Sequence, residues 1–402
     1  MNEFKLKLEK FRKGAMIYVE GSKNIDNFYI IKSGKVKITR NIEITDDQSQ
    51  IYLKEGDYFG VISCMSKRPR LETVTALTDV ILISVRYDQF EELIRRNNTV
   101  ALKILKLYSK RLRTFDDAIA RITLKKPVTS NLEALYNIGL YYYNQQEYKQ
   151  ARYAFTKFTK YCSNSSNISK AYQYLEEINK KLKGIKEYIQ LTPLVRHYYD
   201  KSILFCEHEH GEDVFIIQDG KVKITKIVGD KEVLLAVLNP GDILGEMALI
   251  EDRPRSATAI AFGDVKTLVI NKQNFMIMVQ NKPQIVMKII FLLSERIWIA
   301  YRQLENTAIP DPYGRLVDIL LIQIEKKRVE IAPHKSYQFD FGPDELMTMA
   351  GLEKDKGYPL VRQLLDDPTF RLEGGKIVVV DTNGLYKMVE SYRKKIKRET
   401  IT

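Results

Sequence analysis

Apolar and polar residues alternate in short runs in two parts of the chain. Val36-Lys37-Ile38 and Val74-Thr75-Ala76 show the pattern in the first part, and Val222-Lys223-Ile224 and Ala257-Thr258-Ala259-Ile260 show it in the second. A period of two is typical of β-strands with one buried face. Because glycines separate these short runs, each part predicts a small antiparallel barrel or jelly roll.

The spacing of apolar residues becomes helical after each predicted barrel. Residues 88–126 and 272–308 repeat apolar positions about every 3.6 residues, which predicts helices. In the second segment these positions form one stripe of Ile285, Ile289, Leu292, Leu293, Ile297, Ala300 and Leu304. A stripe of this length can pack on its own barrel and on a partner helix, so we expect a homodimer.

The two predicted barrels are copies of one domain. The segment YIIKSGKVKI at residues 29–38 recurs as FIIQDGKVKI at residues 215–224. Further along, Pro69 and Arg70 of the first copy return as Pro254 and Arg255 of the second. An internal repeat fixes domain boundaries that local propensity cannot.

Both copies resemble the cyclic nucleotide-binding domain of the Crp/Fnr regulators, the regulatory subunits of cyclic nucleotide-dependent kinases, and gated channels. The segment GEMALIEDRPRSAT at residues 245–258 is similar to the phosphate-binding cassette of that family nearly throughout. The resemblance covers about residues 10–126 and 195–308. It implies a cyclic nucleotide ligand, cyclic AMP as the first choice and cyclic GMP as the alternative, and no other cofactor.

The second cassette offers a group for each polar part of such a ligand. Gly245 would let the backbone approach the phosphate, next to a helical turn with free N–H groups. Arg255 would bind the phosphate with its guanidinium, and Ser256 would add a hydroxyl donor. Glu246 would accept from the ribose 2′-hydroxyl. The resemblance assigns Met247, Ala248 and Ala257 to the same site. The alternative is an ordinary surface ion pair between Glu246 and Arg255 beside a glycine turn.

Recognition of the base is open at this point. The resemblance places the base against the helix after the barrel, where this chain has Trp298, Ala300 and Tyr301. An aromatic cap by Tyr301 or Trp298 and plain core packing both fit. A hydroxyl at the position of Ser256 can favour guanine, which keeps cyclic GMP as an alternative.

The first copy departs from this pattern. It keeps Gly60 and Arg70, but Val61 stands where the second copy has Glu246, and Glu72 follows shortly after the arginine. The acceptor for the ribose is missing, and Glu72 would repel a phosphate unless it turned away. We therefore expect a structural or dimer-forming barrel that binds no cyclic nucleotide, with a pocket for another anion as the alternative.

Between the barrels the sequence predicts helices. Leu135, Ile138, Gly139 and Tyr142, followed by Ala151, Phe155 and Phe158, have the spacing of a tetratricopeptide repeat. One such repeat cannot bury its apolar faces alone, so we expect a spacer that packs on the flanking barrels. Binding of a peptide is the alternative.

The C-terminal segment predicts a helix at 311–327, strands near 328–331 and 337–341, helices at 343–350 and 359–366, and a strand pair at 370–380. The turn between the two helices is at Gly351. This order resembles the winged helix-turn-helix of Crp/Fnr regulators, with Gly374-Gly375 in the wing. The resemblance implies contacts to double-stranded DNA by four basic residues, Lys354, Lys356, Arg362 and Lys376.

Three features weaken the DNA hypothesis. The turn-to-helix segment at 352–362 is slightly longer than the family pattern. Pro359 is tolerated only in the first turn of a helix, which makes the recognition helix short. Residues 310–402 include 16 basic and 15 acidic residues, so the net charge of +13 lies mainly near the N-terminus.

Composition narrows the remaining function classes. Three scattered cysteines provide no disulfide framework, and Glu207-His208-Glu209-His210 has no further Cys or His nearby to complete a metal site, so we expect a solvated turn there. No apolar run reaches the roughly 20 residues of a membrane span. We expect a cytoplasmic protein without enzymatic activity, because no nucleophile or general-base pair appears outside the ligand pocket.

The sequence therefore predicts an α+β chain of four parts. These are a degenerate cyclic nucleotide-binding domain (1–126), a tetratricopeptide-like spacer (127–190), a cyclic nucleotide-binding domain with a dimer helix (191–308) and a winged helix (309–402). The favoured function is a cyclic AMP sensor that controls transcription. The alternative is a sensor whose spacer and winged helix contact proteins instead of DNA.

Overall fold

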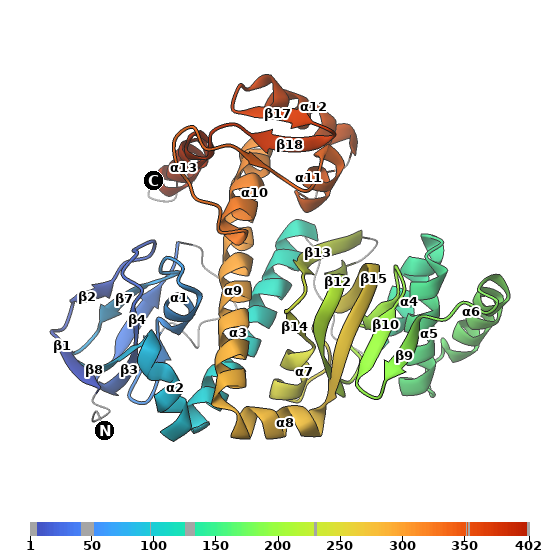
Figure 1. Cartoon of the computed structure of the whole chain (residues 1–402), viewed down its shortest axis with the longest axis horizontal. Helices are drawn as coiled ribbons and strands as arrows, with labels where there is room; N and C mark the ends of the chain where they lie inside the picture. The colour runs from blue at the N-terminus through green and yellow to red at the C-terminus, as the bar shows by residue number, and fades with distance from the viewer. Residues whose placement is uncertain are drawn as a thin grey trace. The chain divides into compact units, whose positions relative to one another are not determined.

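The structure is a computed structural model that describes residues 6–41, 52–96, 98–124, 133–228, 231–350, 352 and 354–399 (Figure 1). The chain divides into two compact units, Met1–Trp298 and Ile299–Thr402. The first unit contains both predicted barrels and the helices between them. The second contains the C-terminal segment.

The first barrel consists of two four-stranded antiparallel sheets. One sheet has the order β1 (Lys7–Phe11), β8 (Val80–Arg86), β3 (Asn27–Ser33) and β6 (Tyr58–Phe59). The other has the order β2 (Met16–Tyr18), β7 (Thr73–Ala76), β4 (Val36–Thr39) and β5 (Tyr52–Leu53). Residues of both sheets, among them Ile31, Val36, Val74 and Leu82, form a single core. The alternating runs at 36–38 and 74–76 are strands, as predicted.

The second barrel is a seven-stranded antiparallel sheet built around two long strands, β12 (Asp213–Val228) and β15 (Thr258–Asn271). Each of them is one continuous strand where the first barrel has two shorter strands. Their pairings with neighbouring strands contain register shifts. The remaining strands are β9 (Tyr188–Thr192), β10 (Val195–Tyr198), β11 (Ile203–Phe205), β13 (Lys231–Leu238) and β14 (Ile243–Leu244).

Each barrel has one short helix and is followed by two longer ones. The short helices are α1 (Val61–Ser66) and α7 (Glu246–Glu251), and the longer ones are α2 (Tyr87–Arg96), α3 (Asn98–Leu124), α8 (Lys272–Asn281) and α9 (Pro283–Thr307). The sequence predicted one helix after each barrel, so the break between α8 and α9 at Lys282 was missed. Tyr108 of α3 lies beside Ser294 of α9, where burial raises the pKa of Tyr108 well above its ordinary value and the serine opposes the rise.

The apolar stripe of α9 is largely covered within the single chain. Its members Ile289, Leu293, Ile297, Ala300 and Leu304 are buried. The homodimer stays a prediction, and this stripe is not an exposed surface on which it could form. No single helix in the described residues is long and apolar enough to cross a membrane, and only α8 and α9 together, bent by 107°, meet the length and composition requirement.

Three helices lie between the barrels, α4 (Ala134–Asn144), α5 (Tyr148–Tyr161) and α6 (Ile168–Lys181). Gly139 lets α4 approach α5 closely, because a Cβ there would lie 2.7 Å from the ring of Phe155. The helices share a core with Ile203, Cys206 and Ile260 of the second barrel. The packing predicted for both flanking barrels is therefore present on the second barrel, whereas the assignment to the tetratricopeptide class stays a prediction.

The second unit contains α10 (Pro312–Lys326), α11 (Pro343–Met349), α12 (Lys354–Asp366) and α13 (Thr382–Glu399), with a small sheet in the order β16 (Tyr337–Gln338), β18 (Lys376–Val379) and β17 (Phe370–Glu373). Asp311 caps α10 by accepting from the N–H groups of Tyr313 and Gly314. Gly374 and Gly375 have φ of 55° and 76°, which suits the tight turn between β17 and β18.

Several predicted boundaries in this unit were wrong. Residues 328–331 form no strand, and the strand expected at 337–341 covers only Tyr337–Gln338. α12 begins at Lys354, so Pro359 lies inside the helix and not in its first turn. Because the residues from Lys354 to Pro359 are also helical, the helix is longer than predicted. Gly351, the expected turn residue, lies outside the described residues.

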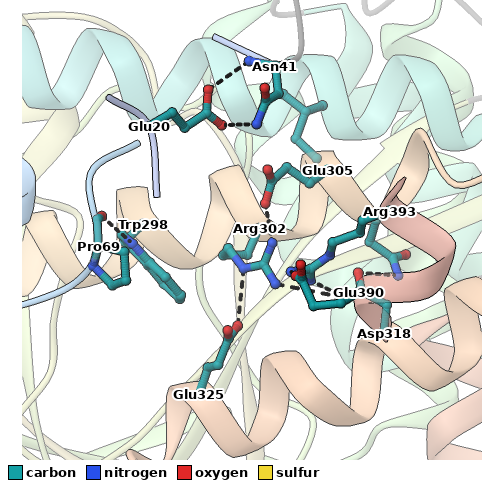
Figure 2. A network of polar contacts seen from close by, with 12 residues as sticks. Glu20, Asn41, Pro69, Trp298, Arg302, Glu305, Asp318, Glu325, Glu390 and Arg393 are labelled. Carbon is teal, nitrogen blue, oxygen red and sulfur yellow. Dashed lines mark hydrogen bonds and ion pairs between the residues drawn. The ribbon is translucent and has the colours of Figure 1, made fainter. Parts of the chain in front are cut away.

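Buried charges connect the helices of this unit (Figure 2). The guanidinium of Arg302 lies 3.1 Å from a carboxylate oxygen of Glu325 and 3.8 Å from one of Asp318, and it also pairs with Glu305. Arg393 of α13 pairs with Asp318 as well. Burial raises the pKa of Asp318 to about 7, against the lowering effect of Arg302. The network joins the end of α9 to α10 and α13.

Candidate functional site

The second cassette begins with a glycine that no other residue could replace without strain. Gly245 has φ of 86° and precedes α7. A Cβ at this position would lie 2.6 Å from Nη1 of Arg255 and 3.0 Å from the carbonyl oxygen of Asp213. Both the positive φ and the close approach require glycine. The predicted approach of this backbone to a phosphate stays a prediction.

Arg255 is almost fully buried, with 4% of its surface exposed. Its Nη1 donates to the carbonyl oxygen of Gly245 and its Nη2 to that of Asp213 at 2.7 Å. The guanidinium carbon lies 4.4 Å from the centre of the Phe205 ring. The third donor, Nε, has no hydrogen-bond partner among the described residues. Burial lowers the pKa of Arg255, while the carboxylate of Glu209 raises it.

Glu246 is buried as well, with 1% of its surface exposed. Its Oε1 accepts a hydrogen bond of 2.8 Å from Nη1 of Arg296 on α9. Its Oε2 has no partner in the part of the chain that the structure describes. The alternative of a surface ion pair between Glu246 and Arg255 is therefore wrong, because both groups are buried and the partner of Glu246 is Arg296.

Arg296 was missed by the sequence analysis. The signal that could have revealed it is the repeat, because Arg296 follows Arg255 at the spacing at which Arg111 follows Arg70. An arginine kept at the equivalent position of both helices indicates a buried carboxylate partner. Arg296 has Glu246 as this partner, and Arg111 has Glu72 at 3.7 Å.

The structure brings the other cassette residues together around α7. Met247, Ala248 and Ala257 are buried, and Ser256 is half-buried. Tyr301 is buried too, but it belongs to the second compact unit, so its role as a base cap stays a prediction.

Trp298 faces the first repeat. Its indole N–H donates to the carbonyl oxygen of Pro69 at 3.2 Å (Figure 2), and its ring lies 4.8 Å from the guanidinium carbon of Arg68. The possibility that Trp298 caps the base in the second barrel is therefore not supported by its contacts.

The segment Glu207–Glu209 was expected to be a solvated turn, and this expectation was wrong. Glu207, His208 and Glu209 are all buried beside the cassette. Glu207 accepts from Nζ of Lys226 at 2.7 Å, and Lys226 also pairs with Asp117 of α3 at 2.7 Å. Burial raises the pKa of Glu207 to about 7 and lowers that of His208 to about 4. Within the described ranges, no group of three or more His, Cys, Asp or Glu residues could hold a metal ion.

The first cassette has the same glycine and arginine but a different charge arrangement. Arg70 donates from Nε, Nη1 and Nη2 to the carbonyl oxygens of Asn24, Gly60 and Asn27 at 2.8, 3.0 and 2.8 Å. Glu72 is 5% exposed. The sequence left open whether Glu72 turns away from the barrel, and the structure places its side chain inside the barrel.

Two arginines hold Glu72 inside the first barrel. Its Oε2 lies 3.1 Å from Nη2 of Arg40 and 3.7 Å from Nη1 of Arg111, and the hydroxyl of Tyr18 reaches Oε1 at 3.5 Å. Burial would raise the pKa of Glu72, but Arg111 and Arg40 outweigh it and lower the pKa. The carboxylate is therefore ionised and paired within the protein.

Comparison with protein families agrees with this geometry. The family model described as the cyclic nucleotide-binding domain matches residues 8–97 and 195–282. The chain carries two cyclic nucleotide-binding domains. The fold of both barrels and the cassettes at Gly60 and Gly245 belong to these domains.

Known regulators of the Crp/Fnr type are homologous to part of this chain. The "Cyclic AMP receptor protein" of Thermus thermophilus is 25% identical over 191 residues, which cover 46% of this chain and 82% of that protein. The "cAMP-activated global transcriptional regulator CRP" of Salmonella typhimurium is 26% identical over 190 residues, which cover 47% and 90%. A solved structure of a CooA mutant from Carboxydothermus hydrogenoformans has a TM-score of 0.42 and 18% identity, covering 53% of this chain and 94% of its own.

A hollow lies at the cassette of the second cyclic nucleotide-binding domain. It has a volume of ≈ 500 Å³, and its lining includes Gly211, Ala248, Arg253 and Lys272. Neither Glu246 nor Arg255 lines it. It does include Ala248, which is one of the residues predicted for the ligand site.

Beyond the two cyclic nucleotide-binding domains, the predicted DNA contacts lie on α12 and the β17–β18 hairpin. Lys356 and Arg362 are exposed on α12, and Lys376 is exposed at the start of β18. Lys354 begins α12, but its side chain lies outside the described residues. Asp355 and Asp366 are also exposed on α12, so acidic and basic side chains share this helix.

Proposed function

We propose that this chain is a sensor that binds cyclic AMP in its second cyclic nucleotide-binding domain and controls transcription. The observation that carries the proposal is a pair of buried polar atoms without protein partners among the described residues, Oε2 of Glu246 and Nε of Arg255. Leaving such atoms unsatisfied costs about 1–3 kcal/mol each. A ligand with a hydroxyl donor and an anionic acceptor would satisfy both.

The ligand chemistry follows from the two groups. The phosphodiester of a cyclic nucleotide accepts from the guanidinium of Arg255 and from N–H groups at the start of α7. The ribose 2′-hydroxyl donates to Glu246, whose other oxygen is held by Arg296. Ser256 adds a hydroxyl at the phosphate, and Met247, Ala248 and Ala257 complete the wall.

Cyclic AMP is favoured over cyclic GMP by the relatives, whose names refer to cyclic AMP. Ser256 keeps cyclic GMP as an alternative ligand, and Tyr301 is the candidate cap for the base. The first domain binds neither nucleotide, because Glu72 already pairs with the arginines that line it. One ligand per chain follows.

The proposed output is binding of double-stranded DNA by a C-terminal winged helix. Support comes from the order of α11, α12 and the β17–β18 hairpin, with Lys354, Lys356, Arg362 and Lys376 as contacts. The named function of the relatives is transcriptional regulation. Ligand binding would shift a pre-existing equilibrium between two positions of this unit, to the extent that the ligand binds one state more tightly.

A specific observation favours a second candidate. The C-terminal segment has 16 basic against 15 acidic residues, which gives little attraction for a polyanion. Under this alternative, the winged helix and the spacer helices α4–α6 contact other proteins in response to the nucleotide.

Calorimetry and a gel-shift assay test the two parts separately. Wild-type chain should bind one cyclic AMP and lose binding on Arg255→Ala, whereas Arg70→Ala should keep it. In the gel-shift assay, cyclic AMP should change binding to DNA, and Arg362→Ala with Lys376→Ala should weaken it. Absence of DNA binding with and without nucleotide, even at low salt, would favour the protein-binding alternative.

A further inference from the structure

Two hydrogen bonds in the first unit are related by the internal repeat. Nη1 of Arg113 on α3 donates to the carbonyl oxygen of Pro254 at 3.2 Å, and Nε1 of Trp298 on α9 donates to that of Pro69 at 3.2 Å. When the two copies are aligned so that Pro69 matches Pro254, Arg113 matches Trp298. Each long helix therefore holds the cassette of the other repeat at the equivalent carbonyl.

Charged pairs support the same crossed arrangement on both sides. Nε of Arg113 lies 3.1 Å from Oε2 of Glu251 at the end of α7. On the other side, Nη2 of Arg68, next to the first cassette, lies 2.8 Å from Oε2 of Glu295 on α9. α3 also packs against β12 and β13 of the second barrel. The two repeats thus contact one another as two subunits of a symmetric dimer would.

We infer that the first repeat is the built-in partner of the second, and that Arg113 is a positioning residue for the ligand site of the second barrel. The inference rests on the proposed function. Arg113 acts through the backbone at Arg255. It donates to the carbonyl oxygen of Pro254, which belongs to the peptide bond between Pro254 and Arg255. The N–H of Arg255 donates to the carbonyl oxygen of Glu209 at 2.9 Å. These two bonds fix the backbone from which the phosphate-binding guanidinium extends.

The positioning role has a consequence that simple structural support lacks. Arg255 contacts one of the two exocyclic phosphate oxygens, so replacement of that oxygen by sulfur weakens binding more than replacement of the other. A guanidinium whose backbone is no longer held by Arg113 discriminates less between the two oxygens. The ratio of affinities for the two phosphorothioate diastereomers of cyclic AMP therefore reports on its position.

The test compares Arg113→Ala with Lys103→Ala in the full chain. Lys103 is exposed on α3 and serves as the matched control. Calorimetry with cyclic AMP and with each phosphorothioate should show about ten-fold weaker cyclic AMP binding in Arg113→Ala, since a hydrogen bond from a charged group is lost. The diastereomer ratio should move toward one, whereas Lys103→Ala should match the wild type in both measurements.

Thermal unfolding of each variant monitors the fold. If Arg113→Ala does not fold, Arg113→Lys provides the test, since it keeps the charge but cannot hold Glu251 and Pro254 together, and the same change in ratio is expected. An unchanged affinity and ratio in a folded Arg113 variant, with normal binding by the wild type, would overturn this inference alone. Failure of the wild type to bind any cyclic nucleotide would overturn the proposed function and this inference with it.

Discussion

Both barrels have an arginine at the same cassette position, but the hydrogen bonds of the two arginines differ. Arg70 and Arg255 each donate to the carbonyl of the cassette glycine and to a carbonyl near the start of a long strand. In the first barrel Nε also has a partner, the carbonyl of Asn24. In the second barrel Nε has none among the described residues. The arginine therefore supports the fold in both repeats, and its presence alone does not identify a binding site.

The carboxylates show the sharper difference. In the second barrel Glu246 lies on α7 and pairs with Arg296, and in the first barrel Glu72 lies next to β7 and pairs with Arg111. An arginine therefore occupies the equivalent position on α3 and α9. Its acidic partner lies on α7 in the second barrel but next to β7 in the first. Glu72 has further partners in Arg40 and Tyr18. Among the described residues, both carboxylate oxygens of Glu72 therefore have partners, whereas Oε2 of Glu246 has none.

The largest expected effect separates the two arginines. Arg255→Ala should weaken cyclic AMP binding by about a thousand-fold, since removal of one partner of a buried charge contact costs several kcal/mol. Arg70→Ala should leave the affinity nearly unchanged and lower the melting temperature, because three carbonyl groups lose their donors. Calorimetry and thermal unfolding of both variants measure these effects. Loss of binding on Arg70→Ala alone would mean that the first barrel is the sensor.

The next effect concerns the paired carboxylate of the first barrel. Glu72→Ala removes the buried carboxylate that Arg40 and Arg111 contact, so the free energy of unfolding should fall by about 3 kcal/mol. Urea denaturation measures the change. Partly exposed Glu91 offers a matched control, because its i,i+4 pair with Arg95 is worth only about 0.5 kcal/mol. Equal losses for Glu72→Ala and Glu91→Ala would contradict the assigned role of Glu72.

A smaller effect is expected for the carboxylate of the second barrel. Glu246→Gln keeps the shape of the side chain but replaces the carboxylate with an amide, so cyclic AMP should bind about ten-fold more weakly. The variant should also lose the preference for cyclic AMP over its 2′-deoxy analogue. Calorimetry with both ligands measures the preference. A preference that survives in Glu246→Gln would place the ribose elsewhere.

Much of this comparison could be predicted from sequence because it depends on local patterns. The cassette residues Gly245 and Arg255 are recognisable by type and spacing, and positive φ at the glycine follows from residue type. Alternation and helical periodicity located the barrels and the helices. The absence of an acidic residue at Val61 is the feature by which the sequence distinguishes the first copy.

The remaining features depend on contacts between distant segments. The partner of Glu246 is Arg296 on α9, and Asp117 of α3 reaches Lys226 of β12. A single sequence does not specify such pairs. The extent of α12 was missed because a proline inside a helix is less common than one at its start, and the burial of Glu207–Glu209 was missed because acidic residues are mostly exposed.

The smallest expected effect concerns Asp116, which α3 has at the repeat position where α9 has Tyr301. Burial raises the pKa of Asp116 to about 7 and Asp117 adds to this, whereas Arg296, Lys226 and Arg113 act in the opposite direction. Because the folded-state pKa lies above the ordinary value of 3.8, its stabilising contribution is complete below about pH 4 and is lost as the pH rises through 7.

Asp116→Asn should therefore reduce the loss of stability between pH 5 and pH 8, as measured by urea denaturation at both pH values. Part of the loss should persist, because Glu207 and Asp318 also have a raised pKa of about 7. Lys103→Ala should retain the full loss of the wild type. An identical pH dependence in Asp116→Asn and the wild type would mean that Asp116 does not change its protonation state between pH 5 and pH 8. In that case the contact between α3 and the second barrel would carry a constant charge, and the difference between Asp116 and Tyr301 would have no effect on pH dependence.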